Sequence, residues 1–329
     1  MQENGVGEDK KETGGLEMGK SNNLWGRLHR SHRPRFHAYG LILPAVALLV
    51  FFFFIPSLYN IELSLHKISL FETAKGRGEF VGLENFIKVT EDPAFYNALK
   101  NTVLWLTGAT VVFRILLGLG LALLLNSKAL KRWHLAGMGR ILIFVPWGVP
   151  PVVAVTIWKW MLHSRYGVVN LTLQNLGLIR QPIFFLTDIS VVWLSIILIV
   201  VWRELPFAVV SFLAGLQSIP QELYEVARID GAGWFHELRY VTLPLLKPII
   251  TIVGFMITIW TFNNFVYVWL STRGGPGDFT HVLGTNVYFE SFVNYKVGYG
   301  ATFGVIMTVI MMGFALVYFS TLFKRNITA

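Results

Sequence analysis

Long apolar runs alternate with polar segments along this chain, and six of the runs are long enough to cross a bilayer as helices. A spanning helix needs about 20 predominantly apolar residues, because each residue adds about 1.5 Å along a hydrocarbon core of about 30 Å. The pattern therefore predicts an all-α membrane protein with six transmembrane helices. These lie near Tyr39–Leu63, Asn101–Leu125, Ile141–Met161, Val191–Leu213, Ile249–Trp269 and Phe303–Phe323.

The composition agrees with a chain that lies in a membrane. Hydrophobic residues make up 54% of the sequence and charged residues 14%, well below the roughly 25% charge of soluble domains. The net charge of +9 is compatible with a nucleic-acid partner, but basic cytoplasmic loops give the same excess. The absence of cysteine excludes disulfides and thiolate metal sites.

The distribution of lysine and arginine predicts which side each polar segment occupies. Cytoplasmic loops carry the excess of basic residues. With both termini in the cytoplasm, the inner segments hold 16 Lys and Arg residues and the longer outer segments hold nine. The inner segments are then 1–37, 126–140, 217–247 and 324–329, and the outer ones are 64–100, 162–188 and 271–297.

Residues 1–37 form a polar, basic cytoplasmic tail, and residues 38–329 form the six-span membrane domain. The first 20 or so residues are expected to be disordered. His29, His32 and His37 lie among arginines and a proline, which favours a basic collar facing phospholipid over a metal site.

The polar segment Ser218–Pro248 is the longest charged interruption in the apolar C-terminal half. Ser218 and Gln221 have the spacing of a capping box, and Pro220 suits a first helical turn. The segment therefore begins with a short helix. In the same way, Asp92 followed by proline predicts the N-cap of a helix that leads into the second span.

Glycines divide this segment into two short helices. Gly231 and Gly233 are expected at positive φ or at close approaches that end the first helix. A second short helix is predicted at Trp234–Tyr240 and is expected to stop before Pro244. An apolar ridge with ordered charges between two spans is typical of a docking element.

The spacing in this segment resembles the EAA loop of ABC importer permeases. That pattern is Glu-Ala-Ala, three residues, Gly, nine residues and Ile-x-Leu-Pro, and its positions here are held by Glu225, Ala227, Gly231, Val241, Leu243 and Pro244. Val226 and Val241 are conservative departures. In that family the loop is the coupling helix that docks on the ATPase. The resemblance thus implies a docking set of Glu222, Glu225, Ala227, Asp230, Gly231, Leu243 and Pro244.

The resemblance also implies partners, cargo and location. The sequence Glu-Leu-Tyr-Glu-Val-Ala-Arg-Ile-Asp-Gly-Ala resembles that of the carbohydrate branch of these permeases, of the maltose and glycerol-phosphate type. Such a permease lies in the bacterial inner membrane, among membrane lipid, as a heterodimer with a second homologous permease. Two ATPase subunits and an extracytoplasmic solute-binding protein complete the importer. ATP and magnesium bind to the ATPase, so no cofactor and no nucleic acid is expected on this chain.

Charged residues within the spans are expected to face a cavity, a partner or each other. Arg114 lies in the second span, Lys159 near the outer end of the third, and Arg203 and Glu204 in the fourth. Lys159 can extend outward to the interface. Arg203 and Glu204 are neighbours and are not expected to face the same way on a helix. A pair between Arg114 and Glu204 is one option, and a structural charge network and a place on the translocation path both remain open.

Sugars present hydroxyls and apolar C–H faces, so a sugar path needs aromatic platforms beside amides or charges. Two adjacent amides in a membrane helix need partners, which makes Asn263 and Asn264 the most informative candidates. Aromatic residues also form interfacial belts, so each single aromatic is a weaker candidate. The substrate-path candidates are Asn263, Asn264, Trp202, Arg203, Phe207 and Trp260.

No motif in the chain predicts catalysis. The turn Gly274–Gly277 is not a phosphate-binding loop, because no Gly-Lys-Ser/Thr follows, and it resembles the Gly-Gly-Pro outer turn of carbohydrate permeases. His-Glu-x-x-His and Gly-x-Ser-x-Gly are also missing, so ATP hydrolysis is expected in a separate subunit. The alternatives are an ABC permease for a non-carbohydrate cargo and a stand-alone facilitator or channel.

Overall fold

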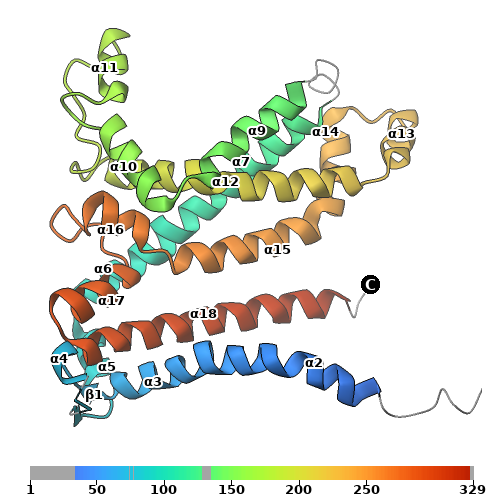
Figure 1. Cartoon of the computed structure of the whole chain (residues 1–329). Helices are drawn as coiled ribbons and strands as arrows, with labels where there is room; N and C mark the ends of the chain where they lie inside the picture. Colours follow the sequence, from blue (N-terminus) through green and yellow to red (C-terminus); the bar gives the residue numbers. More distant parts are fainter. Residues whose placement is uncertain (1–33, 74, 77, 128–134, 327–329) are drawn as a thin grey trace, which may run out of the picture. The chain divides into compact units, whose positions relative to one another are not determined.

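The computed structural model describes residues 34–73, 75–76, 78–127 and 135–326, in two units that comprise residues 1–57 and 58–329 (Figure 1). In the first unit, α2 (Pro34–Leu49) passes through the π-helical segment η1 (Val50–Phe54) into α3 (Ile55–Ser64). Residues 39–57 are exposed throughout. The helix thus begins inside the predicted tail, and residues 1–33, with His29 and His32, lie outside the described residues.

The second unit is mainly helical after the end of α3. The two short strands β1 and β2 pair antiparallel, with His66 opposite Phe80. The remaining elements are β1 (His66–Lys67), α4 (Leu70–Thr73), β2 (Glu79–Phe80), α5 (Glu84–Glu91), α6 (Pro93–Lys100), η2 (Asn101–Ala109), α7 (Thr110–Asn126), α9 (Leu135–Gly148), α10 (Pro151–Met161), α11 (Val168–Asn175), α12 (Val192–Ser218), α13 (Gln221–Ile229), α14 (Trp234–His236), η3 (Glu237–Thr242), α15 (Leu243–Phe262), α16 (Val266–Thr272), α17 (Leu283–Tyr288), η4 (Phe289–Val293) and α18 (Val297–Asn326).

Among the described residues, five helices are long and apolar enough to span a membrane, and a sixth span results if one bent pair is counted. The five are Tyr39–Ser64, Pro93–Asn126, Val192–Ser218, Trp234–Phe262 and Val297–Ser320. The second of these helices begins directly after Asp92, as predicted. The Asp92 carboxylate caps it by accepting a hydrogen bond from the N–H of Ala94 at 2.8 Å. The predicted fifth span was wrong at its end, since its helix stops at Phe262 and not at Trp269.

The predicted third span is not one straight helix. Gly137–Gly148 and Pro151–Met161 meet at an angle of 100°. Two consecutive prolines lie at the bend, and proline lacks the N–H that would continue the helical ladder. The run is apolar enough to span a membrane, as predicted, but the prolines divide it into two helices.

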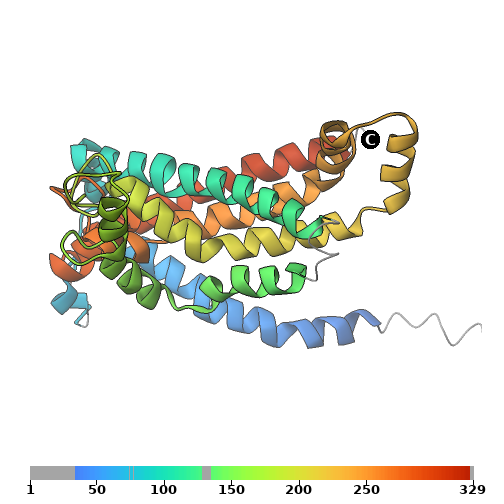
Figure 2. The ribbon, with the colours of Figure 1, turned by 90° about the horizontal axis from the view of Figure 1, so that it is seen from above.

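The long helix α12 is the centre of the second unit. It packs against α7, α9 and α15, and 56% of its most apolar window is buried. Both ribbon views show α7 and α12 side by side (Figure 2). A Cβ on Gly118 of α7 would lie 2.9 Å from the Cβ of Ala208 in α12, so the two backbones approach closely only because both residues are small.

Candidate functional site

A polar cavity of 260 Å³ lies where α7, α12 and the end of α15 meet. Arg114 comes from the first of these helices, and Arg203 and Glu204 come from the second, so three of the four intramembrane charges that the sequence singled out converge here. Lys159, the fourth, is not in this lining and donates to the Leu270 carbonyl at 3.0 Å. The lining includes Arg114, Arg203, Glu204, Trp260, Asn264 and Tyr267.

The Glu204 carboxylate is the centre of this polar cavity. Its Oε1 accepts hydrogen bonds from Arg203 Nη1 and from the Tyr267 hydroxyl, both at 2.6 Å. Its Oε2 lies 3.9 Å from Arg114 Nη2. One carboxylate therefore lies between two guanidinium groups and makes a charge-assisted hydrogen bond with one of them.

Arg114 is held by two further bonds and is almost fully enclosed. Its side chain is 1% exposed, with Nη2 donating to the backbone carbonyl of Glu204 and Nη1 donating to Thr261 Oγ1, each at 3.1 Å. Its Nε has no hydrogen-bond partner among the described residues. Burial of a charge costs little only when the charge is paired and hydrogen-bonded, so this remaining donor is a position at which a ligand atom would be favoured.

The close approach of α7 and α12 explains why these charges meet. Gly118 and Ala208 are each four residues, about one helical turn, from Arg114 and Glu204 respectively. The small pair lets the backbones come together, and the long side chains one turn away then span the same gap.

Arg203 and Glu204 bond to each other, so the expectation that they face apart was wrong. Adjacent helical residues point about 100° apart, but both side chains are long enough to curve toward a common point. Arg203 is also fixed by a bond from Nε to the carbonyl of Val149 at 3.1 Å. That carbonyl lies in the break between α9 and α10, where a helix end leaves acceptors unpaired.

A second candidate site is the α13–α14 loop, residues 219–243, which follows the C-terminal end of α12 and is mostly exposed. Its first helix, α13, ends in a Schellman turn: Ala232 N–H bonds the Ala227 carbonyl at 2.9 Å, and Gly231 N–H bonds the Arg228 carbonyl at 3.0 Å. Gly231 adopts φ = +81°, as the turn requires. Ala227 and Gly231 therefore set the shape of the loop.

Side-chain bonds close the α13–α14 loop on itself. Arg228 forms two bonds with the Glu237 carboxylate, at 2.6 and 3.3 Å, and this bonding raises the pKa of Arg228. The Tyr224 hydroxyl lies 3.1 Å from Thr242 Oγ1, which in turn donates to the Glu237 carbonyl at 3.2 Å. The loop thus has a defined shape, while Glu222, Glu225 and Asp230 remain exposed on it.

Three details of the predicted loop were wrong. Ser218 does not form a capping box, because its hydroxyl bonds the Gly215 carbonyl and Pro220 is the residue before the helix. Gly233 has an ordinary φ of −79°. The helix that begins at Trp234 does not stop before Pro244 but continues to Phe262. The π-helical segment η3, which contains the exposed Tyr240, directly precedes the turn with Pro244, and its wider turn accommodates the proline.

Comparison with known proteins places the chain in a family. Residues 114–328 match the model of the binding-protein-dependent transport system inner membrane component. The chain belongs to this family. Among its relatives, the trehalose/maltose transport system permease protein MalF of Thermococcus litoralis is 32% identical over 90% of this chain and 96% of that protein. The sulfoquinovosyl glycerol transport system permease protein SmoG of Agrobacterium fabrum is 34% identical over 84% of this chain and 87% of that one.

Solved structures agree in fold. A chain from a bacterial ABC transporter involved in the import of the acidic polysaccharide alginate superposes with a TM-score of 0.74 at 23% identity, covering 94% of this chain and 100% of that one. The protein is therefore an inner-membrane permease component with the fold of ABC importer permeases. Large apolar side chains exposed along its spans, such as Leu194 and Leu316, are compatible with this location.

Three of the predicted path residues of this inner membrane component line the polar cavity: Arg203, Trp260 and Asn264. Phe207 packs edge-on against Trp260 with ring centroids 4.8 Å apart, and Trp202 packs against Trp158 at 5.7 Å. Asn263 lies outside the lining.

The two asparagines are not within a membrane helix, contrary to the prediction. They lie in the break between α15 and α16, where Asn264 Oδ1 accepts the N–H of Val266 at 3.1 Å. Asn263 is exposed and bonds the Ile259 carbonyl at 2.9 Å. Each amide thus makes one hydrogen bond to nearby backbone. Trp147 lines the cavity without having been given a role from the sequence, and intramembrane charge was the signal that pointed to Arg114 and Glu204.

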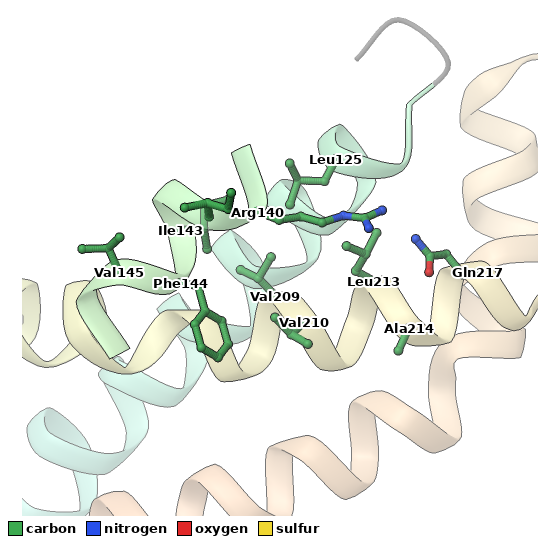
Figure 3. Close-up of a pocket in the computed structure, with 11 residues that line it drawn as sticks. Leu125, Arg140, Ile143, Phe144, Val145, Val209, Val210, Leu213, Ala214 and Gln217 are labelled. Carbon is green, nitrogen blue, oxygen red and sulfur yellow. The ribbon is translucent and has the colours of Figure 1, made fainter. Parts of the chain in front are cut away.

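Two larger cavities are less suited to a hydroxyl-rich solute between the spans. A groove of 510 Å³ between α9 and the ends of α7 and α12 is lined by apolar side chains except for Arg140 and Gln217 near one end (Figure 3). A cleft of 770 Å³ lies among the connecting segments at the opposite end of the spans, with Lys67, Asp92 and Glu290 in its lining. Of these three cavities, the polar cavity is the best candidate for solute contact within the membrane.

Proposed function

We propose that this chain is the permease subunit of an ATP-driven importer that moves a sugar or related carbohydrate across the bacterial inner membrane. The observation that carries the proposal is the polar cavity, in which charges and an amide lie beside the aromatic faces of Trp147 and Trp260. Sugars combine hydroxyls with apolar C–H faces, so they match this mixture. The names of the relatives, which refer to transport of trehalose and maltose or of sulfoquinovosyl glycerol, support the same cargo class.

The proposed path follows the cavity and its surroundings. Arg203, Trp260 and Asn264 contact the solute. Phe207 and Trp202 support this lining from behind, through their ring contacts with Trp260 and Trp158. The exposed amide of Asn263, next to Asn264 in the chain, is the proposed contact at the edge of the path.

The proposed ATPase contact is the α13–α14 loop. Glu222, Glu225 and Asp230 offer exposed charges, while Ile229 and Trp234 are 85% and 67% exposed and offer apolar surface. Ala227 and Gly231 hold the turn, and Leu243 and Pro244 begin α15, through which movement of the loop reaches the cavity. This assignment places both termini and the loop in the cytoplasm, as the distribution of basic residues predicts.

The complete importer would contain a second homologous permease, two ATPase subunits and an extracytoplasmic solute-binding protein. ATP and magnesium would bind to the ATPases, with no cofactor on this chain. ATP shifts the equilibrium between outward- and inward-facing states only if it binds the two states with different affinity, and the loop is the route by which that difference reaches the spans.

Purification of the tagged full chain from its own host in mild detergent tests this assembly. The proposal predicts that an ATPase and a second permease co-purify. A chain that purifies alone and equilibrates solute across vesicles without ATP would instead be a facilitator. Co-purification with an ATPase but uptake restricted to amino acids or phosphate would leave the importer intact and contradict the cargo.

A further inference from the structure

The charges of the polar cavity do not balance. Arg114 and Arg203 contribute two guanidinium groups, and Glu204 contributes the single carboxylate that both approach. The described lining therefore carries one positive charge in excess. An excess charge between membrane spans is costly unless an opposite charge joins it.

Both guanidinium groups retain hydrogen-bond donors that no described residue accepts. Arg114 Nε is buried and unpartnered. Arg203 uses Nε for Val149 and Nη1 for Glu204, which leaves its Nη2 without a bond among the described residues. Arg203 is 17% exposed on its side chain, so it lies at the accessible edge, whereas Arg114 lies deeper at 1%.

The rest of the lining suits a sugar ring. Trp147 and Trp260 are 39% and 45% exposed, so their faces are available for C–H contacts, and Asn264 adds a polar group. A volume of 260 Å³ is below the roughly 300 Å³ at which ligand pockets usually begin, so the cavity holds a small unit of the cargo at a time.

We propose that the cargo is an anionic carbohydrate, whose carboxylate, sulfonate or phosphate is received in the polar cavity by the free donors of Arg203 and Arg114. Planar guanidinium groups bind such oxyanions with charge-assisted bonds. The anion supplies the missing negative charge and leaves as the carbohydrate moves on. This inference rests on the proposed importer function and narrows its cargo.

The test uses the complete transporter in its own host or in proteoliposomes, with ATP-dependent uptake as the readout. The probes are matched sets of neutral and anionic sugars. Glucose, galactose and mannose are each compared with their own C6-carboxylate, 6-deoxy-6-sulfonate and 6-phosphate derivatives. Neutral oligosaccharides are compared with oligosaccharides of uronates. At least one anionic member should be taken up about tenfold faster than its neutral counterpart, and which anion this is identifies the group.

Substitutions at Arg203 locate the selectivity in this chain rather than in the binding protein. Arg203→Gln should lower the ratio of anionic to neutral uptake about tenfold or more, mainly through KM, because one charge-assisted contact is lost. Arg203→Lys should keep most of the ratio, since it keeps the charge. Arg180→Gln, at an exposed arginine before α12, should leave the ratio unchanged.

The outcomes separate this inference from the function on which it rests. ATP-dependent uptake confined to neutral sugars, or an Arg203→Gln variant that lowers anionic and neutral uptake equally, overturns the anionic cargo and leaves the importer standing. Absence of ATP-dependent uptake for every carbohydrate overturns the proposed function itself.

Discussion

Replacing Gly231 by valine strains the turn that ends α13 without creating any clash. A Cβ at this position meets nothing within 4 Å, so the only effect is on the backbone, which has φ = +81°. For an L-residue the left-handed region costs roughly 1–2 kcal/mol, with β-branched residues least tolerated. The two Schellman bonds contribute about 0.5–1.5 kcal/mol each. The strain is therefore comparable to the stabilisation that holds the turn.

Gly231→Val should consequently reduce ATP-dependent uptake about 5- to 30-fold, the population change that corresponds to 1–2 kcal/mol. The amount of chain in the membrane, measured by immunoblot, should stay unchanged. Gly233→Val is the matched control, because Gly233 lies in the same loop, has φ = −79° and also has nothing within 4 Å. Wild-type uptake in Gly231→Val, or an equal loss in both variants, would show that transport does not depend on the left-handed turn at Gly231.

Three other changes test the contact of Arg114 with Glu204, the close approach of α7 and α12, and the protonation of His281. Glu204→Gln removes the counterion of buried Arg114 and should destabilise the chain by about 3 kcal/mol or more, seen as a lower Tm in detergent; Glu222→Gln, at an exposed residue, is the control, and equal Tm values would contradict the pairing. Gly118→Val should lower the free energy of unfolding by about 1–3 kcal/mol, because the added side chain forces α7 away from Ala208. Gly120→Val is the control, since a Cβ there meets no atom within 4 Å, and it should leave the stability unchanged. Similar losses of stability in both variants would show that the close approach of α7 and α12 is unimportant. Burial lowers the pKa of His281, against the opposing effect of Asp278. Below about pH 6.5 the unfolded chain therefore binds more protons than the folded chain, so Tm should fall between pH 7 and pH 5. The fall should be smaller in His281→Gln. An identical fall in the wild-type chain and the variant would show that His281 is not the cause of the pH dependence.

The sequence was sufficient for the features that depend on local chemistry. Apolar run length located five helices long enough to span a membrane, Asp92 predicted a helix start, and Gly231 predicted a left-handed helix end. Each of these follows from residues close together in the chain, and the family resemblance rested on the same local spacing.

The features that depend on contacts between distant residues could not be predicted in the same way. The charge of Arg114 was evident, but its contact with Glu204 depends on how closely α7 approaches α12 at Gly118. Asn264 was singled out for its amide, yet whether it lies inside a helix or in a break is decided by how α15 and α16 pack. The bend between α9 and α10 likewise depends on whether neighbouring helices accommodate or straighten a proline pair.

The importer function is tested most directly by carbohydrate uptake into proteoliposomes that hold the purified complex, compared with and without ATP on the side of the α13–α14 loop. An ATP-driven importer accumulates the carbohydrate above the external concentration only when ATP, magnesium and the solute-binding protein are all present. Equilibration without ATP, or uptake that does not require the binding protein, would contradict it.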